Sequence, residues 1–367
     1  MTHANVYEVA IGLVPGIGNQ LTRQLVSYCG DPEQVFREKK GKLLKIPGIG
    51  ENIAQSIIQS DIFSKAEQQV EMAIKTETKI LFYTNHDYPE RLKTIMDAPT
   101  LIYYKGQGPL NFPKTIGVVG TRKATGYGKE MTEKIISELK AQNVQIISGL
   151  AYGIDSYAHK SALDNGLSTI GVMATGVNIV YPAVHKEMAK RMQTSGGILS
   201  EYPFDTKPEP GYFPARNRII AGLSDVVIVV EASDSGGALI TAELANGYNR
   251  EVMAVPGNIN NKYSLGCNNL IKSHKAQIFS KTSDIIELMN WDISALPKSK
   301  IKTTEIPEGL TNDEKKIFEL LISNGETHID ELCWKSQISV SKMASLLLNL
   351  EFNNQVKSLP GKKYKLV

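Results

Sequence analysis

Two groups of side chains in the middle of the chain have the chemistry to hold a phosphate or a nucleic acid. The first group follows an apolar run at 115–120 and consists of Thr121, Arg122 and Thr125. Hydroxyl groups and a guanidinium are suitable hydrogen-bond donors to a phosphate. A helix is expected from about Lys129, so these residues should lie in the loop that joins a strand to a helix.

The second group lies in the segment FPARNRIIAG at 213–222. Its aromatic residue, Phe213, could stack on a base, a contact worth about 1–3 kcal/mol. Arg216 and Arg218 are two positions apart and cannot point the same way on a regular helix. We therefore expect one arginine to meet a phosphate and the other to brace the loop, with Asn217 between them.

Two glycine-containing loops extend this set. The segments SGLA at 148–151 and SGGALIT at 235–241 each place small residues before a helix. Backbone N–H groups and the helix dipole favour an anion at such a position. The residues predicted to contribute are Ser148, Gly149, Gly236, Gly237 and Thr241.

Other interpretations of these residues stay open. The aromatic residue could belong to the core, with the arginines paired to acids such as Glu201 or Glu231. His159, His185 and Asp155 are conceivable catalytic or metal-binding residues, but no H-x-x-x-H, C-x-x-C or G-x-S-x-G motif supports them. The glycines that follow the run at 115–120 lack the G-x-G-x-x-G spacing of a dinucleotide site. We predict no catalytic residue, no metal site and no cofactor.

The elements that must position these loops are six short apolar runs, which alternate with helix-length amphipathic runs between 111 and 290. The runs are TIGVVG, VQIISG, STIGVMATG, GGILSEY, DVVIVVE and EVMAVPG. Strands this apolar are buried on both faces, and their alternation with helices predicts an α/β fold with a doubly wound parallel sheet. Open sheets of this kind bind ligands at the carboxyl ends of their strands. The loops should therefore meet at one edge and form a trough for phosphates.

The N-terminal zone contains an internal duplication. The segments VPGIG at 14–18 and IPGIG at 46–50 separate helical runs, and they resemble the paired helix-hairpin-helix modules of DNA-processing proteins. Glycines permit the positive φ of a tight hairpin, and the following helix start could face a phosphate. Alternatively, the hairpins only turn one helix back on another.

The C-terminal zone, about 308–367, has three helical patterns followed by a lysine-rich wing, as in a winged helix. A winged helix places its third helix in a duplex groove. Lys342 is the only base in that helix, so binding to a groove is disfavoured, and a protein-interaction role or weak duplex binding stays open.

The overall charge excludes a protein coated in positive charge. Lys and Arg number 41 and Asp and Glu 38, which gives +3 over 367 residues. The counts are 12 and 12 in residues 1–110, 18 and 16 in 111–290, and 11 and 10 in 291–367. The three cysteines are far apart, which fits a reducing compartment. With no secretory pattern at the start and no membrane-length apolar run, we expect a cytoplasmic protein with no membrane association.

The motifs also resemble a known family. The segments that carry the resemblance are, in order, GTRKATGYG, SGLAYGIDSYAH, YPAVH, SEYP, FPARNRIIAGLSD, VVEA, SGGALITAELA, VPGN and NNLIKSHKA. Over about 80–290 they closely resemble the DNA-processing protein A (DprA/Smf) family of natural transformation. The resemblance implies an extended Rossmann-like domain that binds single-stranded DNA and forms a homodimer. It also implies loading of the RecA recombinase onto incoming DNA, with displacement of single-strand-binding protein and no catalytic activity.

The resemblance carries over to named residues and domains. Arg122 stands in what is usually a Gly-Ser-Arg signature, where Thr121 replaces the serine but keeps a hydroxyl. The segment 216–218 matches the Arg-Asn-Arg signature that lines the DNA pocket, whereas His185 and the SHKA segment at 273–276 depart from the usual residues. The expected domains are a helix-hairpin-helix or SAM-like domain at 1–78, the Rossmann-like domain at 79–292, a linker at 293–308 and a winged-helix-like domain at 309–367.

The alternative function is a nucleotide-binding enzyme of the related phosphoribohydrolase type. Those enzymes carry a Pro-Gly-Gly-x-Gly-Thr-x-x-Glu signature, and this chain has SGGALITAE at 235–243. The acid, Glu243, is retained, but Ala-Leu-Ile makes the loop bulkier.

Overall fold

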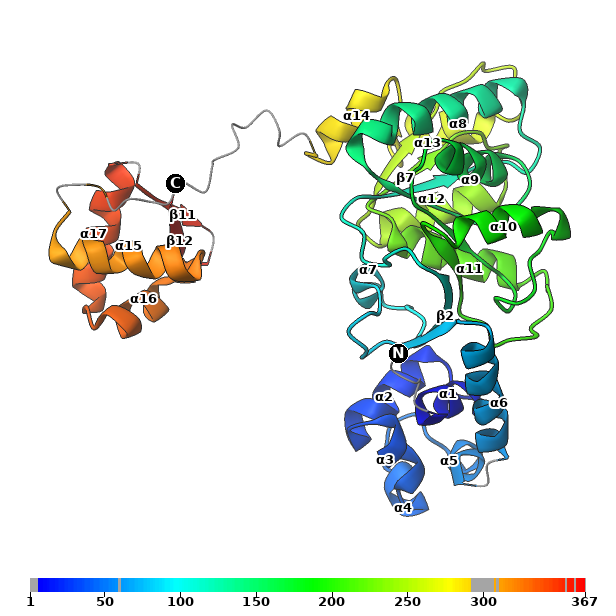
Figure 1. Ribbon diagram of the computed structural model, residues 1–367, viewed down its shortest axis with the longest axis horizontal. Helices are drawn as coiled ribbons and strands as arrows, with labels where there is room; N and C mark the ends of the chain where they lie inside the picture. The colour runs from blue at the N-terminus through cyan, green and yellow to red at the C-terminus, as the bar shows by residue number, and fades with distance from the viewer. Residues whose placement is uncertain are drawn as a thin grey trace. The chain divides into compact units, whose positions relative to one another are not determined.

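The computed structural model describes residues 6–58, 61–291, 307, 310–353, 355–359 and 361–366 (Figure 1). Two compact units divide the chain, Met1–Asp292 and Ile293–Val367. The linker expected at 293–308 lies outside the described residues apart from Pro307. Among the described residues, no helix combines the length and apolar character needed to cross a membrane.

The N-terminal zone is helical, as its sequence predicts. Its helices are α1 (Val6–Leu13), α2 (Asn19–Cys29), α3 (Pro32–Arg37), α4 (Lys40–Leu43), α5 (Glu51–Ile58) and α6 (Ile62–Lys75). In the two hairpins, Gly16 has φ +83° and Gly48 has φ +80°, a conformation that favours glycine. A Cβ on Gly48 would lie 3.0 Å from Leu21, and one on Gly16 would lie 3.6 Å from Ile53. Each hairpin therefore packs against the helix that follows the other hairpin, which confirms the tandem arrangement.

A nine-stranded sheet forms the centre of the first unit, in the order β1-β2-β6-β5-β4-β3-β7-β8-β9. The strands are β1 (Lys79–Phe82), β2 (Leu101–Gly106), β3 (Thr115–Val119), β4 (Gln145–Ser148), β5 (Thr169–Val172), β6 (Gly197–Ser200), β7 (Val226–Val229), β8 (Glu251–Ala254) and β9 (Gln277–Ile278). Strands β3 to β9 pair in parallel, whereas β2 is antiparallel to both β1 and β6. The six apolar runs correspond to β3–β8, so the predicted parallel sheet is confirmed.

Helices cover both faces of this sheet. They are α7 (Glu90–Lys93), α8 (Gly126–Leu139), α9 (Ile154–Asp164), α10 (Lys186–Met192), α11 (Tyr212–Leu223), α12 (Gly237–Gly247), α13 (Leu265–Lys272) and α14 (Thr282–Leu288), with short 3-10 turns η1 (Lys140–Gln142) and η2 (Ala183–His185). In β7, Val226 and Ile228 pack in one cluster with α8, α9 and α14. Val227 and Val229 pack in another cluster with α7, α11, α12 and α13. Alternate side chains thus serve opposite faces, as a doubly wound sheet requires.

The strand order changes direction at β3. The chain proceeds from β3 through β4 and β5 to β6 on one side, and then α11 returns it to β7 on the other side of β3. The carboxyl ends of β3 and β7 are neighbours at this switch, where open α/β sheets bind ligands. The helical zone lies at the opposite end of the sheet from β9, beside β1 and β2 (Figure 1).

The second unit has the predicted winged-helix pattern. Its elements are α15 (Asn312–Asn324), β10 (Thr327–His328), α16 (Ile329–Ser336), α17 (Val340–Phe352), β11 (Val356–Leu359) and β12 (Lys363–Leu366). The strands form an antiparallel sheet in the order β10-β12-β11. Ile317, Leu332 and Leu347, one from each helix, are fully buried in its core.

Candidate nucleic-acid interface

A carboxylate from the segment after β7 holds the loop after β3. Helix α8 begins at Gly126, three residues before the expected start, which makes Thr125 its N-cap: Thr125 Oγ1 accepts a hydrogen bond from Gly128 N–H at 3.3 Å. The Thr125 N–H and hydroxyl donate to the carboxylate of Glu231 at 2.9 and 2.5 Å. A Cβ on Gly128 would collide with that carboxylate. Glu231 therefore fills the position at the start of α8 where a dinucleotide phosphate would otherwise sit.

A second carboxylate, in the first turn of α9, holds the loop after β4. The Ser148 hydroxyl is buried and donates to the Val118 carbonyl at 2.6 Å, so it faces the protein interior. Asp155, at the start of α9, accepts from Ala151 N–H at 3.4 Å. A Cβ on Gly149 would lie 2.6 Å from Asp155 Oδ2. Both predicted anion positions, at 121–125 and at 148–151, are thus occupied by carboxylates of the same chain.

Arg216 braces the ends of β4 and β5. Its side chain is buried, and Nη1 donates to the carbonyls of Gly149, at 2.6 Å, and Val172. These carbonyls belong to the ends of β4 and β5, so one guanidinium ties two strand ends together. Burial lowers the pKa of Arg216 to about 10, and the nearby Asp155 carboxylate opposes this effect. Burial raises the pKa of Asp155, and Arg216 in turn opposes it.

Arg218 pairs with Glu201, one of the two acids that the sequence offered as partners for the arginines. The two side chains of this ion pair are 12% and 13% exposed. Burial raises the pKa of Glu201, and the charge of Arg218 opposes the rise. The other acid considered for the arginines, Glu231, binds Thr125 instead.

Arg122 and Phe213 are the two predicted residues that meet at the surface. Arg122 is exposed, and its guanidinium carbon lies 5.3 Å from the centroid of the half-buried Phe213 ring, within the range of a cation–π contact. The neighbouring Thr121 holds the loop, because its N–H donates to the Glu231 carbonyl at 2.7 Å and its hydroxyl accepts from Lys123 N–H at 3.2 Å. A positive group and an aromatic ring are therefore presented together at the switch between β3 and β7.

The start of α12 is the third part of this edge. Gly236 and Gly237 are exposed, and the Gly237 carbonyl accepts hydrogen bonds from Asn217 Nδ2 and from the Thr241 hydroxyl, both at 3.1 Å. Asn217 and Thr241 thus fix the helix start rather than face the solvent. The exposed backbone of the two glycines lies at a helix N-terminus, where an anion is favoured.

The residues considered for catalysis have structural partners. His159 is buried with Nδ1 2.7 Å from the Thr169 hydroxyl, and burial lowers its pKa to about 3. His185 Nδ1 lies 2.8 Å from the Leu150 carbonyl. Glu243, the acid retained from the enzyme signature, pairs with Lys275 at 2.6 Å. Within the described ranges, no group of three His, Cys, Asp or Glu side chains could hold a metal ion.

Both hairpins of the N-terminal zone already have partners at the helix start. At the first, Asn19 Oδ1 accepts from the N–H and hydroxyl of Thr100 in the sheet domain, at 2.9 and 3.1 Å. At the second, Glu51 is the first residue of α5 and pairs with Lys40 at 2.5 Å. An acid at a helix start opposes a phosphate there. These contacts favour the interpretation in which the hairpins only turn and dock helices.

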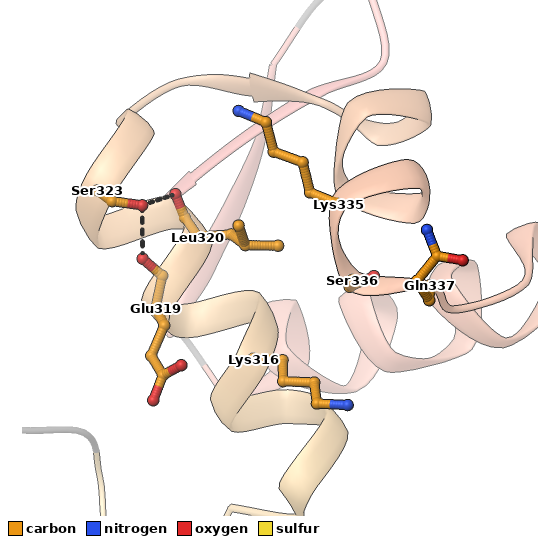
Figure 2. Close-up of a pocket in the computed structure, with 7 residues that line it drawn as sticks. All are labelled: Lys316, Glu319, Leu320, Ser323, Lys335, Ser336 and Gln337. Atoms are coloured by element: carbon orange, nitrogen blue, oxygen red, sulfur yellow. Dashed lines mark hydrogen bonds between the residues drawn. The ribbon is translucent and has the colours of Figure 1, made fainter.

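The C-terminal unit has a pocket of about 470 Å³ between α15 and α16. Figure 2 shows its lining, which consists of Lys316, Glu319, Leu320, Ser323, Lys335, Ser336 and Gln337. The Ser323 hydroxyl in its wall donates to the carbonyls of the preceding turn, and Lys335 pairs with Glu331 at 2.8 Å. Lys342, the base of the third helix, pairs with Asp313 at 2.5 Å.

Two exposed tyrosines at the same edge were not among the predicted site residues. Tyr152 follows β4 and Tyr181 follows β5. The signal that could have found them is the presence of an aromatic residue shortly after a strand, in the segments SGLAYG and VYP.

Comparison with known proteins assigns a family to each part of the chain. The family model described as DNA recombination-mediator protein A matches residues 79–290. A DprA winged-helix domain matches 302–362, and a SAM-like helix-hairpin-helix tandem matches 11–60. The chain is 32% identical to protein Smf of Synechocystis, over 98% of both chains.

Two solved structures are also similar. DNA processing protein A of Streptococcus pneumoniae matches with a TM-score of 0.68 and 34% identity, over 77% of this chain and 97% of that one. DNA processing protein A of Helicobacter pylori, whose structure addresses its single-stranded DNA binding mode, matches with a TM-score of 0.53 and 30% identity, over 59% and 97%. The chain therefore belongs to the DprA/Smf family of DNA-processing recombination mediators.

Proposed function

We propose that this protein binds single-stranded DNA without base preference at the carboxyl edge of its sheet. The observation that carries the proposal is the pairing of exposed Arg122 with Phe213 at the β3–β7 switch. Arg122 would contact a phosphate, Phe213 would stack on a base, and the exposed start of α12 at Gly236 and Gly237 would accept a second phosphate. The single-stranded DNA binding of the Helicobacter pylori relative supports this assignment.

The remaining predicted residues would act by shaping this surface. Arg216 and Arg218 are held by carbonyls and by Glu201 respectively, and Thr125 is held by Glu231. The proposed role of these side chains is to keep the loops rigid, so that Arg122 is correctly placed. The phosphoribohydrolase alternative has less support, because Ala-Leu-Ile makes the loop at 235–243 bulkier than the signature of those enzymes, and Glu243 forms a surface ion pair with Lys275.

The cellular role that we propose is that of a recombination mediator. A homodimer would bind incoming single-stranded DNA in the cytoplasm during natural transformation, load RecA onto it and displace single-strand-binding protein. Membership of the DprA/Smf family supports this role. Two copies of a site with few charges would also gain affinity through avidity on one strand.

Oligo-dT binding over a salt series tests the site. We expect the Arg122→Ala variant to bind oligo-dT more weakly. The salt slope, meaning the slope of log K against log salt concentration, should become shallower by about 0.7, the value for one phosphate contact on a single strand. Arg191→Ala is the matched control, because Arg191 is exposed and pairs with Asp164 at the end of α9, at the other edge of the sheet. If the parent protein releases free base from nucleoside monophosphates, the enzyme alternative is favoured. Equal binding by parent and Arg122→Ala would contradict the assignment.

RecA loading needs a separate assay. RecA filament growth on oligo-dT coated with single-strand-binding protein should be accelerated by the parent and less by Arg122→Ala. If the parent binds oligo-dT but does not accelerate filament growth, the mediator role is wrong and the DNA-binding site still stands.

A further inference from the structure

Tyr181 extends the surface formed by Arg122 and Phe213. Its ring centroid lies 5.7 Å from that of Phe213, and the two planes are inclined by 56°. At this inclination the edge of one ring approaches the face of the other, so the contact covers at most one face of the Tyr181 ring. Tyr181 is 48% exposed although it is a large aromatic residue. It therefore presents ring surface to the solvent directly beside the residue proposed to stack on a base.

Tyr152 continues this row on the loop after β4. Its ring lies 5.4 Å from the ring of His185, inclined by 63°, and it is 51% exposed. His185 is buried and bonded to the Leu150 carbonyl at 2.8 Å, so it holds the loop of Tyr181 against the loop of Tyr152. The three residues Phe213, Tyr181 and Tyr152 form what we call the aromatic rim.

The loop that carries Tyr152 also packs against the loop that carries Arg122. Gly153, next to Tyr152, approaches the β3 loop so closely that a Cβ there would lie 2.8 Å from the Cα of Arg122. The rim residues therefore come from the loops after β4 and β5 and from the first turn of α11, which meet at one edge of the sheet. Single exposed aromatics are common on protein surfaces, but here Tyr181 contacts Phe213 directly, and Tyr152 is connected to the Tyr181 loop through His185. Exposed apolar side chains gathered in this way form a patch, and such a patch marks an interaction site.

We propose that Tyr181 and Tyr152 are stacking platforms for further bases beside the one at Phe213. This inference rests on the proposed function and adds to it that bases, in addition to phosphates, supply much of the affinity. Every base has a π-face, so stacking adds affinity without sequence preference. It also requires no positive charge, which suits a chain whose net charge is only +3.

Alanine variants of the two tyrosines test the proposal. Each of Tyr181→Ala and Tyr152→Ala should weaken oligo-dT binding roughly 5- to 150-fold, the range for loss of one stacked base. The salt slope should not change, because no phosphate contact is lost. Tyr181→Phe should bind like the parent, since the ring is retained. Tyr28→Ala is the matched control, because Tyr28 is 62% exposed on α2, away from the rim.

An abasic oligonucleotide of the same length separates stacking from positioning. The parent and both alanine variants should bind this probe equally, because it has the phosphates but no bases. Tyr181→Ala should still lower oligo-dT affinity in a Phe213→Ala background, because it serves a different base. If Tyr181 only positions Phe213, the second substitution will have no further effect, and the inference is wrong.

The outcomes also separate this inference from the proposed function. If the parent does not bind oligo-dT, or if Arg122→Ala binds as well as the parent, the proposed site is wrong. If Arg122→Ala is weakened while Tyr181→Ala and Tyr152→Ala bind oligo-dT like the parent, the site stands and the stacking role is wrong.

Discussion

Replacing Arg218 by alanine should destabilise the fold rather than remove a direct DNA contact. Arg218 and Glu201 form an ion pair in which the side chains are 12% and 13% exposed. Removing one partner of a buried ion pair costs about 3–5 kcal/mol, because the other charge stays buried without compensation. Folded domains are stable by about 5–15 kcal/mol, so the variant should fold but unfold at a clearly lower urea concentration.

The charge on Glu201 provides the control. A double variant, Arg218→Ala with Glu201→Gln, leaves no buried charge and should recover much of the lost stability. Burial already raises the pKa of Glu201, and without Arg218 this pKa should rise further above its value in the unfolded chain. The folded state then binds more protons than the unfolded state, so stability increases as the pH falls. The cost of Arg218→Ala should therefore shrink between pH 7 and pH 5.

Urea unfolding followed by circular dichroism measures this cost, and oligo-dT binding is measured below the unfolding transition. We expect the folded Arg218→Ala protein to lose less affinity than Arg122→Ala, because Arg218 supports the site without contacting DNA. The reasoning would be refuted by a variant that unfolds at the same urea concentration as the parent yet loses oligo-dT binding, because Arg218 would then contact DNA directly.

Three further predictions concern other parts of the chain. His159 is buried with a pKa of about 3, below its unfolded value, so the unfolded state takes up the proton first and stability is lost as the pH falls below about 6.5. This loss, up to about 1.4 kcal/mol per pH unit, should be absent in a His159→Asn variant, as urea unfolding at several pH values would show. Gly48→Ala should lower the free energy of unfolding by at least about 1 kcal/mol, because Gly48 has φ +80° and a Cβ there would have little space. Gly50→Ala is the control and should cost less, because Gly50 has open space and no positive φ. Equal thermal stabilities of the two variants would contradict this prediction. Lys342→Ala should leave affinity for duplex DNA unchanged in a gel-shift assay, because its amino group is paired with Asp313.

Much of the fold follows from local patterns. The six apolar runs became β3–β8 because a strand buried on both faces must be apolar at nearly every position, and this is visible without knowledge of the neighbouring strands. The two P-G-I-G segments became hairpins because Gly16 and Gly48 adopt a backbone conformation that other residues rarely adopt. The carboxyl-edge location of the candidate site followed from the same parallel topology.

The sequence by itself thus determined the order of the elements, the edge at which the loops gather and the residue types available there. Only the tertiary structure decided which of those residues are free to meet a ligand. Arg218 is held by Glu201, and Thr125 is held by Glu231, which is 106 positions away. The physical reason is that a local pattern specifies backbone conformation and burial, whereas the partner of a polar group depends on which distant loops the strand order brings together. The same strand order places Tyr181 beside Phe213 and leaves both rings at the surface.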